Sequence, residues 1–253
     1  LALEMFEHPV PMTFDGPEEL HKIYSAYQKQ LEINPRAEAP QMILRLLVPD
    51  EHSTVPLGEK FGAADTTIES LTQTGVSLKL PIIGVSFHCG SGNHDPQSYA
   101  TAIRLARSAI EMIDNIQGEG KCQLLDIGGG YPGRDGCGGD HGRFCGQLAE
   151  SLPNDSEADG ADAESTAQIA QVVTPLLDEL FNDDIRVISE PGRYFVEGAF
   201  ALCSRIYRVR AEHKNDRVVR MHYYIAQGVQ GVFKDCVLCG ETFLPIPLSL
   251  RNV

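Results

Sequence analysis

The 253-residue chain has no tryptophan and few basic side chains, 21 Lys and Arg against 35 Asp and Glu. The formal net charge of -14 argues against a nucleic-acid polyanion as the main partner but permits a cationic one. No run of about 18 apolar residues occurs, so we expect no membrane-spanning helix and no membrane partner. The first residues lack a basic segment followed by an apolar one, which argues against a signal peptide.

The chain also lacks the paired cysteines of a disulfide-stabilised protein. Its 7 cysteines are an odd, scattered set, which is typical of reduced thiols and predicts a cytoplasmic protein. Cys236 and Cys239 have the spacing of a zinc-ligand pair, but no second pair and no paired histidines accompany them. We therefore expect no metal site. Because residue 1 is not methionine and residues 1–8 read as the end of a helix, we expect the chain to be part of a longer protein.

Apolar runs alternate with amphipathic segments over most of the chain. Strands are expected at 10–15, 41–48, 82–87, 122–127 and 185–189, and helices at 17–31, 66–73, 96–116 and 166–181. Asp15 occupies an N-cap-like position before the first of these helices. Repeated strand–helix alternation of this kind predicts an α/β fold with a parallel sheet.

Two regions depart from that alternation. Residues 134–165 are dominated by Gly, Asp, Glu, Ser and Asn with little apolar periodicity, which predicts an acidic surface insertion. After residue 198 the pattern changes to strands without helices, expected at 201–209 and 221–226. We therefore predict a first domain over 1–198 that contains the insertion, and the start of an all-β domain over 199–253.

Three of the predicted strands end in glycine together with polar or reactive side chains. The run LLDIGGGYPG contains Gly128–Gly130, which lack a Cβ and can let backbone N–H groups converge on an anion. GVSFHCGSG, before it, carries His88 and Ser91, and SEPGRY, after it, carries Glu190 and Arg193. In a (β/α) barrel, functional residues lie at such C-terminal strand ends.

These residue types suit a planar aromatic cofactor that carries a phosphate. An imidazole can stack on the ring, a carboxylate can bond a protonated ring nitrogen, and Ser, Arg and backbone N–H groups can hold the phosphate. Structural explanations compete, namely a core histidine, an ion pair around the Pro-Gly turn and an ion pair for the arginine in the strand at 41–48. Joint occurrence at successive strand ends favours binding. The predicted binding set is Arg45, His88, Ser91, Gly128, Gly129, Gly130, Glu190 and Arg193.

In this order, GVSFHCGSG, LLDIGGGYPG and SEPGRY resemble the fold-type III pyridoxal-phosphate-dependent decarboxylases, most closely eukaryotic ornithine decarboxylase and its paralogues. MTFDGPEEL, LRLLVPDE, GEKFGA and YYIAQGVQGVF extend the resemblance over nearly all of the chain outside the acidic insertion. The resemblance implies an alanine-racemase-like (β/α) barrel, N-terminally incomplete here, followed by a truncated C-terminal β domain.

The resemblance implies pyridoxal 5′-phosphate as the cofactor. His88 would stack on the pyridine ring, and Glu190 would pair with its nitrogen. The phosphate would be held by Ser91, Gly130 and Arg193, in a turn that the two preceding glycines shape. Family members are homodimers with shared active sites, which implies a homodimer here as well.

The chain departs from the family at the catalytic and substrate-binding residues. The family's Schiff-base lysine lies in a Tyr-Ala-Val-Lys-like motif upstream of everything seen here, and no lysine matches it; Lys60 matches a lysine at the dimer interface. The C-terminal Cys-Asp-Gly motif and the late aromatic phosphate contact are absent, and the substrate-binding Asp would fall near Leu238 or Cys239. No catalytic residue is therefore identified, and we expect no covalent attachment of the cofactor by this chain.

Three functions remain open. The chain is the middle of an ornithine-decarboxylase-like enzyme, which decarboxylates a small cationic amino acid once the missing segments complete it. Alternatively, it is a catalytically inactive paralogue that acts by binding a regulatory protein, as antizyme-inhibitor-like relatives do. In the third case, it is a repurposed enzyme that uses the retained cofactor-binding residues for another phosphate-bearing or aromatic ligand.

Overall fold

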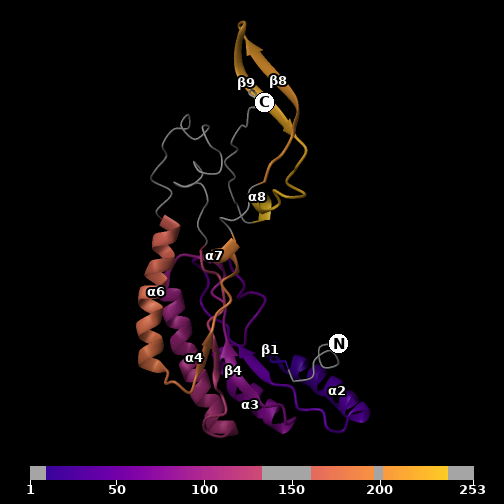
Figure 1. Ribbon diagram of the computed structural model, residues 1–253, viewed down its shortest axis with the longest axis vertical. Helices are drawn as coiled ribbons and strands as arrows, with labels where there is room; N and C mark the ends of the chain where they lie inside the picture. The colour runs from indigo at the N-terminus through magenta and orange to yellow at the C-terminus, as the bar shows by residue number, and fades with distance from the viewer. Residues whose placement is uncertain (1–9, 133–160, 197–201, 239–253) are drawn as a thin grey trace. The chain divides into compact units, whose positions relative to one another are not determined.

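The computed structural model describes residues 10–132, 161–196 and 202–238 (Figure 1). These residues fall into two compact units, one formed by 10–132 with 161–196 and the other by 202–238. Most of the predicted acidic insertion and the end of the predicted β domain lie outside the described residues. In the described part of the chain, no helix is long and apolar enough to cross a membrane.

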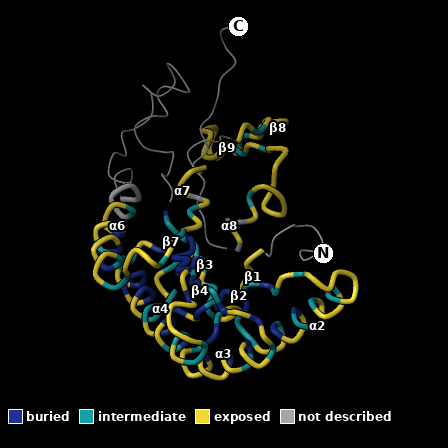
Figure 2. Tube along the Cα trace, turned by 60° about the horizontal axis from the view of Figure 1, so that its bottom comes forward, coloured by how far each residue is buried: buried dark blue, intermediate teal, exposed yellow. Residues whose placement is uncertain are grey.

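The first unit is built on one parallel sheet with the strand order β1-β2-β4-β6-β7. Its strands are β1 (Met12–Phe14), β2 (Met42–Arg45), β4 (Ile82–Ser86), β6 (Leu124–Asp126) and β7 (Arg186–Ile188). The helices between them are α2 (Pro17–Ile33), α3 (Ile68–Ser77), preceded by the short η1 (Asp65–Thr67), α4 (Pro96–Gln117) and α6 (Ala161–Leu180). Figure 2 shows these α-helices as an outer arc with the strands on its concave side. The predicted α/β class is confirmed.

Helix α4 shows how closely local sequence determines an element. Asp95 is its N-cap, and its carboxylate accepts hydrogen bonds from the N–H groups of Gln97 and Ser98 at 3.1 and 3.0 Å. Pro96 in the first turn has no N–H to satisfy. Apolar residues at helical spacing are buried along one face, namely Tyr99, Ile103, Ala106, Ile110 and Ile113.

Two predictions about helix starts are wrong. Helix α2 has Gly16 as its N-cap and no side-chain cap. Asp15 instead accepts a hydrogen bond from the N–H of Gly62 at 2.8 Å, so its carboxylate joins segments distant in sequence. Helix α6 begins at Ala161, inside the predicted insertion, because residues 161–165, Ala-Asp-Ala-Glu-Ser, include good helix formers that extend the amphipathic segment.

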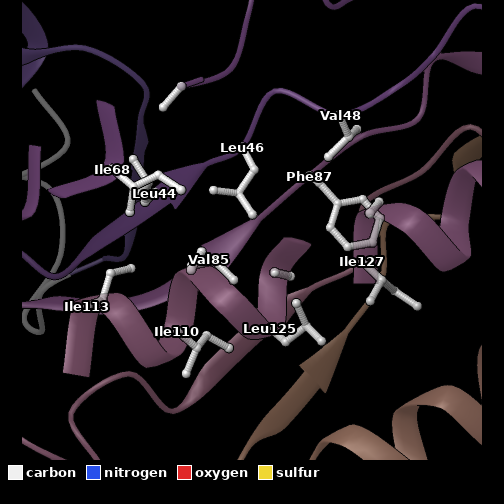
Figure 3. Packing of buried hydrophobic residues seen from close by; sticks show 14 of the residues in the cluster. Leu44, Leu46, Val48, Ile68, Val85, Phe87, Ile110, Ile113, Leu125 and Ile127 are labelled. Carbon is white, nitrogen blue, oxygen red and sulfur yellow. The ribbon is translucent and has the colours of Figure 1, made fainter. Parts of the chain in front are cut away.

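The core lies between the sheet and its helices. Leu44, Val85 and Leu125 occupy the same register position on three neighbouring strands and are all buried. Figure 3 shows this row with Ile110 and Ile113 of α4. Side chains alternate along a strand, so the residues just after this row face the concave side of the sheet.

The second unit is a two-stranded antiparallel hairpin of β8 (Ile206–Lys214) and β9 (Arg217–Ile225), followed by the short helix α8 (Asp235–Leu238). Asn215 and Asp216 join the strands with φ angles of 50° and 59°, as in a two-residue type I′ turn. Strands are thus present in both regions, 201–209 and 221–226, where the sequence predicts them. The boundary of the two domains near residue 198 stays a prediction.

Candidate functional site

Polar side chains occupy the last register position of three neighbouring strands. Arg45, Ser86 and Asp126 are paired across β2, β4 and β6, one position after the buried apolar row. Ser86 and Asp126 are buried, and the Ser86 hydroxyl has no hydrogen-bond partner among the described residues. The sequence motifs do not single out Ser86 or Asp126, because the signal is their common register, which a single sequence does not display. The row marks the concave face as polar at the C-terminal end of the sheet.

Arg45 contacts an aromatic ring at this end of the sheet. Its guanidinium carbon lies 4.8 Å from the centroid of the Phe61 ring, a cation–π distance. The charge of Arg45 also contributes to lowering the pKa of His88. Arg45 therefore acts on the site through its charge and its position at the end of β2.

His88 follows β4 and is half-buried. Its Nδ1 accepts a hydrogen bond from the N–H of Gly90 at 3.1 Å. Burial, followed by the charge of Arg45, lowers the pKa of His88, while Glu190 and Asp50 oppose the shift. An accepting Nδ1 and a lowered pKa describe a neutral imidazole with its proton on Nε2.

Residues Gly128–Gly130 follow β6 and form a turn, called here the glycine turn. Two of its three positions require glycine. Gly128 and Gly130 have φ angles of +63° and +92°, which L-residues with a side chain rarely adopt. A Cβ on Gly128 would lie 1.9 Å from the carbonyl oxygen of Phe87. A Cβ on Gly130 would lie 1.9 Å from that of Gly90. The backbone of the turn therefore contacts the backbone of residues 87–90, the His88 segment.

Hydrogen bonds hold the carbonyls of the turn from two sides. The N–H of Glu190, after β7, donates to the carbonyl of Gly128 at 2.7 Å, and the N–H of Asn93 donates to that of Gly130 at 3.1 Å. Among the described residues, the N–H groups of Gly129 and Gly130 have no acceptor. Fixed backbone donors of this kind can bind an anion.

The His88 ring lies against the same turn. A Cβ on Gly129 would be 3.1 Å from the His88 Nε2, and one on Gly130 would be 3.3 Å from its Cε1. Asp126 supports the turn, since its Oδ1 accepts from the N–H of Gly128 at 2.9 Å. Burial raises the pKa of Asp126, partly offset by that hydrogen bond.

The other predicted site residues are placed less fully. Ser91 begins the short strand β5 (Ser91–Asn93), which pairs antiparallel with β3 (Ser53–Val55). Glu190 is exposed, and Arg193 lies in α7 (Gly192–Val196), with its side chain outside the description. Lys60 is exposed. Cys239 lies outside the described residues. The structure thus joins the His88 segment, the glycine turn and Glu190, while phosphate contacts by Ser91 and Arg193 stay predictions.

Known proteins resemble this chain in sequence. The family described as "Pyridoxal-dependent decarboxylase, pyridoxal binding domain" matches residues 4–197. Ornithine decarboxylase of Caenorhabditis elegans is 34% identical over 241 residues, which cover 90% of this chain and 47% of that protein. Antizyme inhibitor 2 of Xenopus laevis is 33% identical over 231 residues, which cover 88% of this chain and 42% of that protein.

A solved structure shares the fold of this chain. The arginine decarboxylase of Paramecium bursaria Chlorella virus, bound to agmatine, superimposes with a TM-score of 0.70 and 26% identity, covering 96% of this chain and 54% of that one. This chain thus spans about half the length of the relatives it matches. The matched family domain is the pyridoxal-binding one, which confirms the cofactor class that the motifs imply. The chain belongs to the pyridoxal-phosphate-dependent decarboxylases of the ornithine decarboxylase type.

Proposed function

We propose that this chain provides the cofactor site of an ornithine-decarboxylase-like protein, which decarboxylates a small cationic amino acid once further segments complete it. One observation carries the proposal: three strand ends meet at Gly128–Gly130, whose carbonyls are held while two adjacent N–H groups stay free among the described residues. The five-stranded sheet would then form one side of the barrel that such proteins use. A homodimer with the exposed Lys60 at its interface, and a cytoplasmic location, belong to the same proposal.

The residues of the site fit pyridoxal phosphate. The free N–H groups of Gly129 and Gly130 would hold the phosphate, with Ser91 as a further donor. Because the glycines have no Cβ, their backbone can lie directly against that of Phe87 and Gly90, which fixes the position of these donors. Arg193, in the short helix after β7, would bring a positive charge to the same phosphate.

Two side chains would orient the ring of the cofactor. When bound, pyridoxal phosphate withdraws electrons from the bond that breaks in its substrate. The neutral His88 imidazole would lie against the ring without adding a charge. The Glu190 carboxylate would hold a proton on the ring nitrogen, which keeps the ring cationic and strengthens its hold on electrons.

A catalytically inactive paralogue that binds a regulatory protein is the second candidate function. Its support is the identity of 33% to an antizyme inhibitor over 231 residues. Release of CO2 from ornithine, arginine or lysine by the full-length protein separates the two. An inactive paralogue would release none, and an enzyme would release it in proportion to bound cofactor.

Replacing Glu190 with alanine should weaken binding of pyridoxamine 5′-phosphate about tenfold, because a charge-assisted hydrogen bond to the ring nitrogen is lost. This probe has no aldehyde, so it does not react with surface lysines. Its fluorescence during titration measures the dissociation constant. Glu119→Ala, an exposed change beyond the opposite end of the sheet, is the matched control and should bind as the wild type does. Equal binding by both variants would show that Glu190 does not face the ring.

A further inference from the structure

Asn93, the last residue of β5, is fully buried and uses its polar groups in three directions. Its Nδ2 donates to the carbonyl of Cys89 at 2.7 Å, and its Oδ1 accepts from the N–H of Asp95 at 2.9 Å. Its backbone N–H donates to the carbonyl of Gly130 at 3.1 Å. One residue thus connects the His88 segment, the start of α4 and the glycine turn.

The partners of the Asn93 side chain are fixed. Asp95 is the N-cap of the 22-residue helix α4, so its backbone moves only with that helix. Cys89 is buried directly after His88. The side chain therefore ties its own loop to a rigid element at one end and to the site at the other.

The hydrogen bond from the Asn93 N–H to the Gly130 carbonyl connects this anchored loop to the glycine turn. Of the two carbonyl contacts, the one from Glu190 comes from an exposed residue. The one from Asn93 comes from a buried residue held by two side-chain hydrogen bonds, one buried and one partly buried. Asn carries an amide donor and a carbonyl acceptor on one short side chain, which neither Asp nor an apolar residue offers.

We propose that Asn93 is a positioning residue for the phosphate-binding turn: it holds Gly130 so that the free N–H groups of Gly129 and Gly130 converge on a phosphate monoester. The inference rests on the proposed function, in which the cofactor phosphate binds at this turn. The Asn93 side chain does not contact the phosphate. It acts through the backbone of the turn.

The test compares two probes that differ only in the phosphate, pyridoxamine 5′-phosphate and pyridoxamine. In Asn93→Ala the preference for the phosphorylated probe should fall about tenfold, because misaligned N–H groups lose hydrogen bonds to a charged group. The affinity for pyridoxamine should change little. Asn182→Ala removes an exposed Asn side chain that bonds Asp184 and should leave the preference intact. Both dissociation constants are measured on full chain shown to be folded by circular dichroism.

Each outcome has one meaning. An equal loss of affinity for both probes would show a merely structural role and overturn the inference. Unchanged affinity for both probes in Asn93→Ala would overturn it while leaving the proposed function standing. A wild type without any phosphate preference would refute the proposed function and the inference together. If Asn93→Ala does not fold, Asn93→Ser keeps a hydroxyl for one of the two partners and should give an intermediate preference.

Discussion

Replacing Gly128 with alanine is expected to lower the free energy of unfolding by about 3 kcal/mol or more. The new Cβ would lie 1.9 Å from the carbonyl oxygen of Phe87, and the φ of +63° is unfavourable for alanine. The clashing atom is backbone at the end of the buried strand β4, so it cannot move aside as the end of a flexible side chain can. Relief requires moving the turn away from the His88 segment.

The control for this prediction is Gly120→Ala. Gly120 has nearly the same φ, +69°, but no atom within 4 Å of an added Cβ, so only backbone strain of about 1 to 2 kcal/mol applies. Urea unfolding followed by far-ultraviolet circular dichroism gives both values, provided that the slopes agree. If the two variants lose the same free energy, the close contact between Gly128 and Phe87 does not exist in solution.

Replacing Phe87 with alanine should cost about 3 to 5 kcal/mol of unfolding free energy. The Phe87 side chain is 2% exposed and belongs to the buried cluster that includes Val48 and Ile127 (Figure 3). Truncation removes a large apolar surface from a core where strand ends and α4 meet, and leaves a cavity that rigid neighbours fill only in part.

Phe195→Ala makes the same chemical change at a side chain that is 71% exposed, and should alter stability by about 0.5 kcal/mol or less. Thermal and urea unfolding of both variants measure the difference. Similar losses at the two positions would mean that Phe87 is not part of a packed core, and the support beneath the glycine turn would have to be assigned to other residues.

The elements with strong local signals were predictable from the sequence. An apolar stripe predicted a helix over 96–116, and α4 covers Pro96–Gln117. The strand before the glycines was predictable because its apolar run stops abruptly at Gly128. These signals act over a few residues, and one sequence displays them in full.

The rest depends on contacts between distant segments. Asp15 has the residue type and position of a helix cap, yet its carboxylate bonds Gly62, and no local pattern distinguishes the two roles. Ser86 and Asp126 lie side by side only because of the register of β4 and β6. Asn93 was hidden for the same reason, because its importance lies in joining three segments that only the fold brings together.

The central claim is that Gly128–Gly130 and the His88 segment form a phosphate-binding cofactor site. Amide chemical shifts of the ¹⁵N-labelled chain during titration with pyridoxamine 5′-phosphate test this claim most directly. We expect Gly129, Gly130 and Ser91 to show the largest changes, with little change at Glu119 and Gly120, between α4 and β6 beyond the opposite end of the sheet. Saturable binding that leaves the Gly129 and Gly130 amides unshifted would contradict the claim.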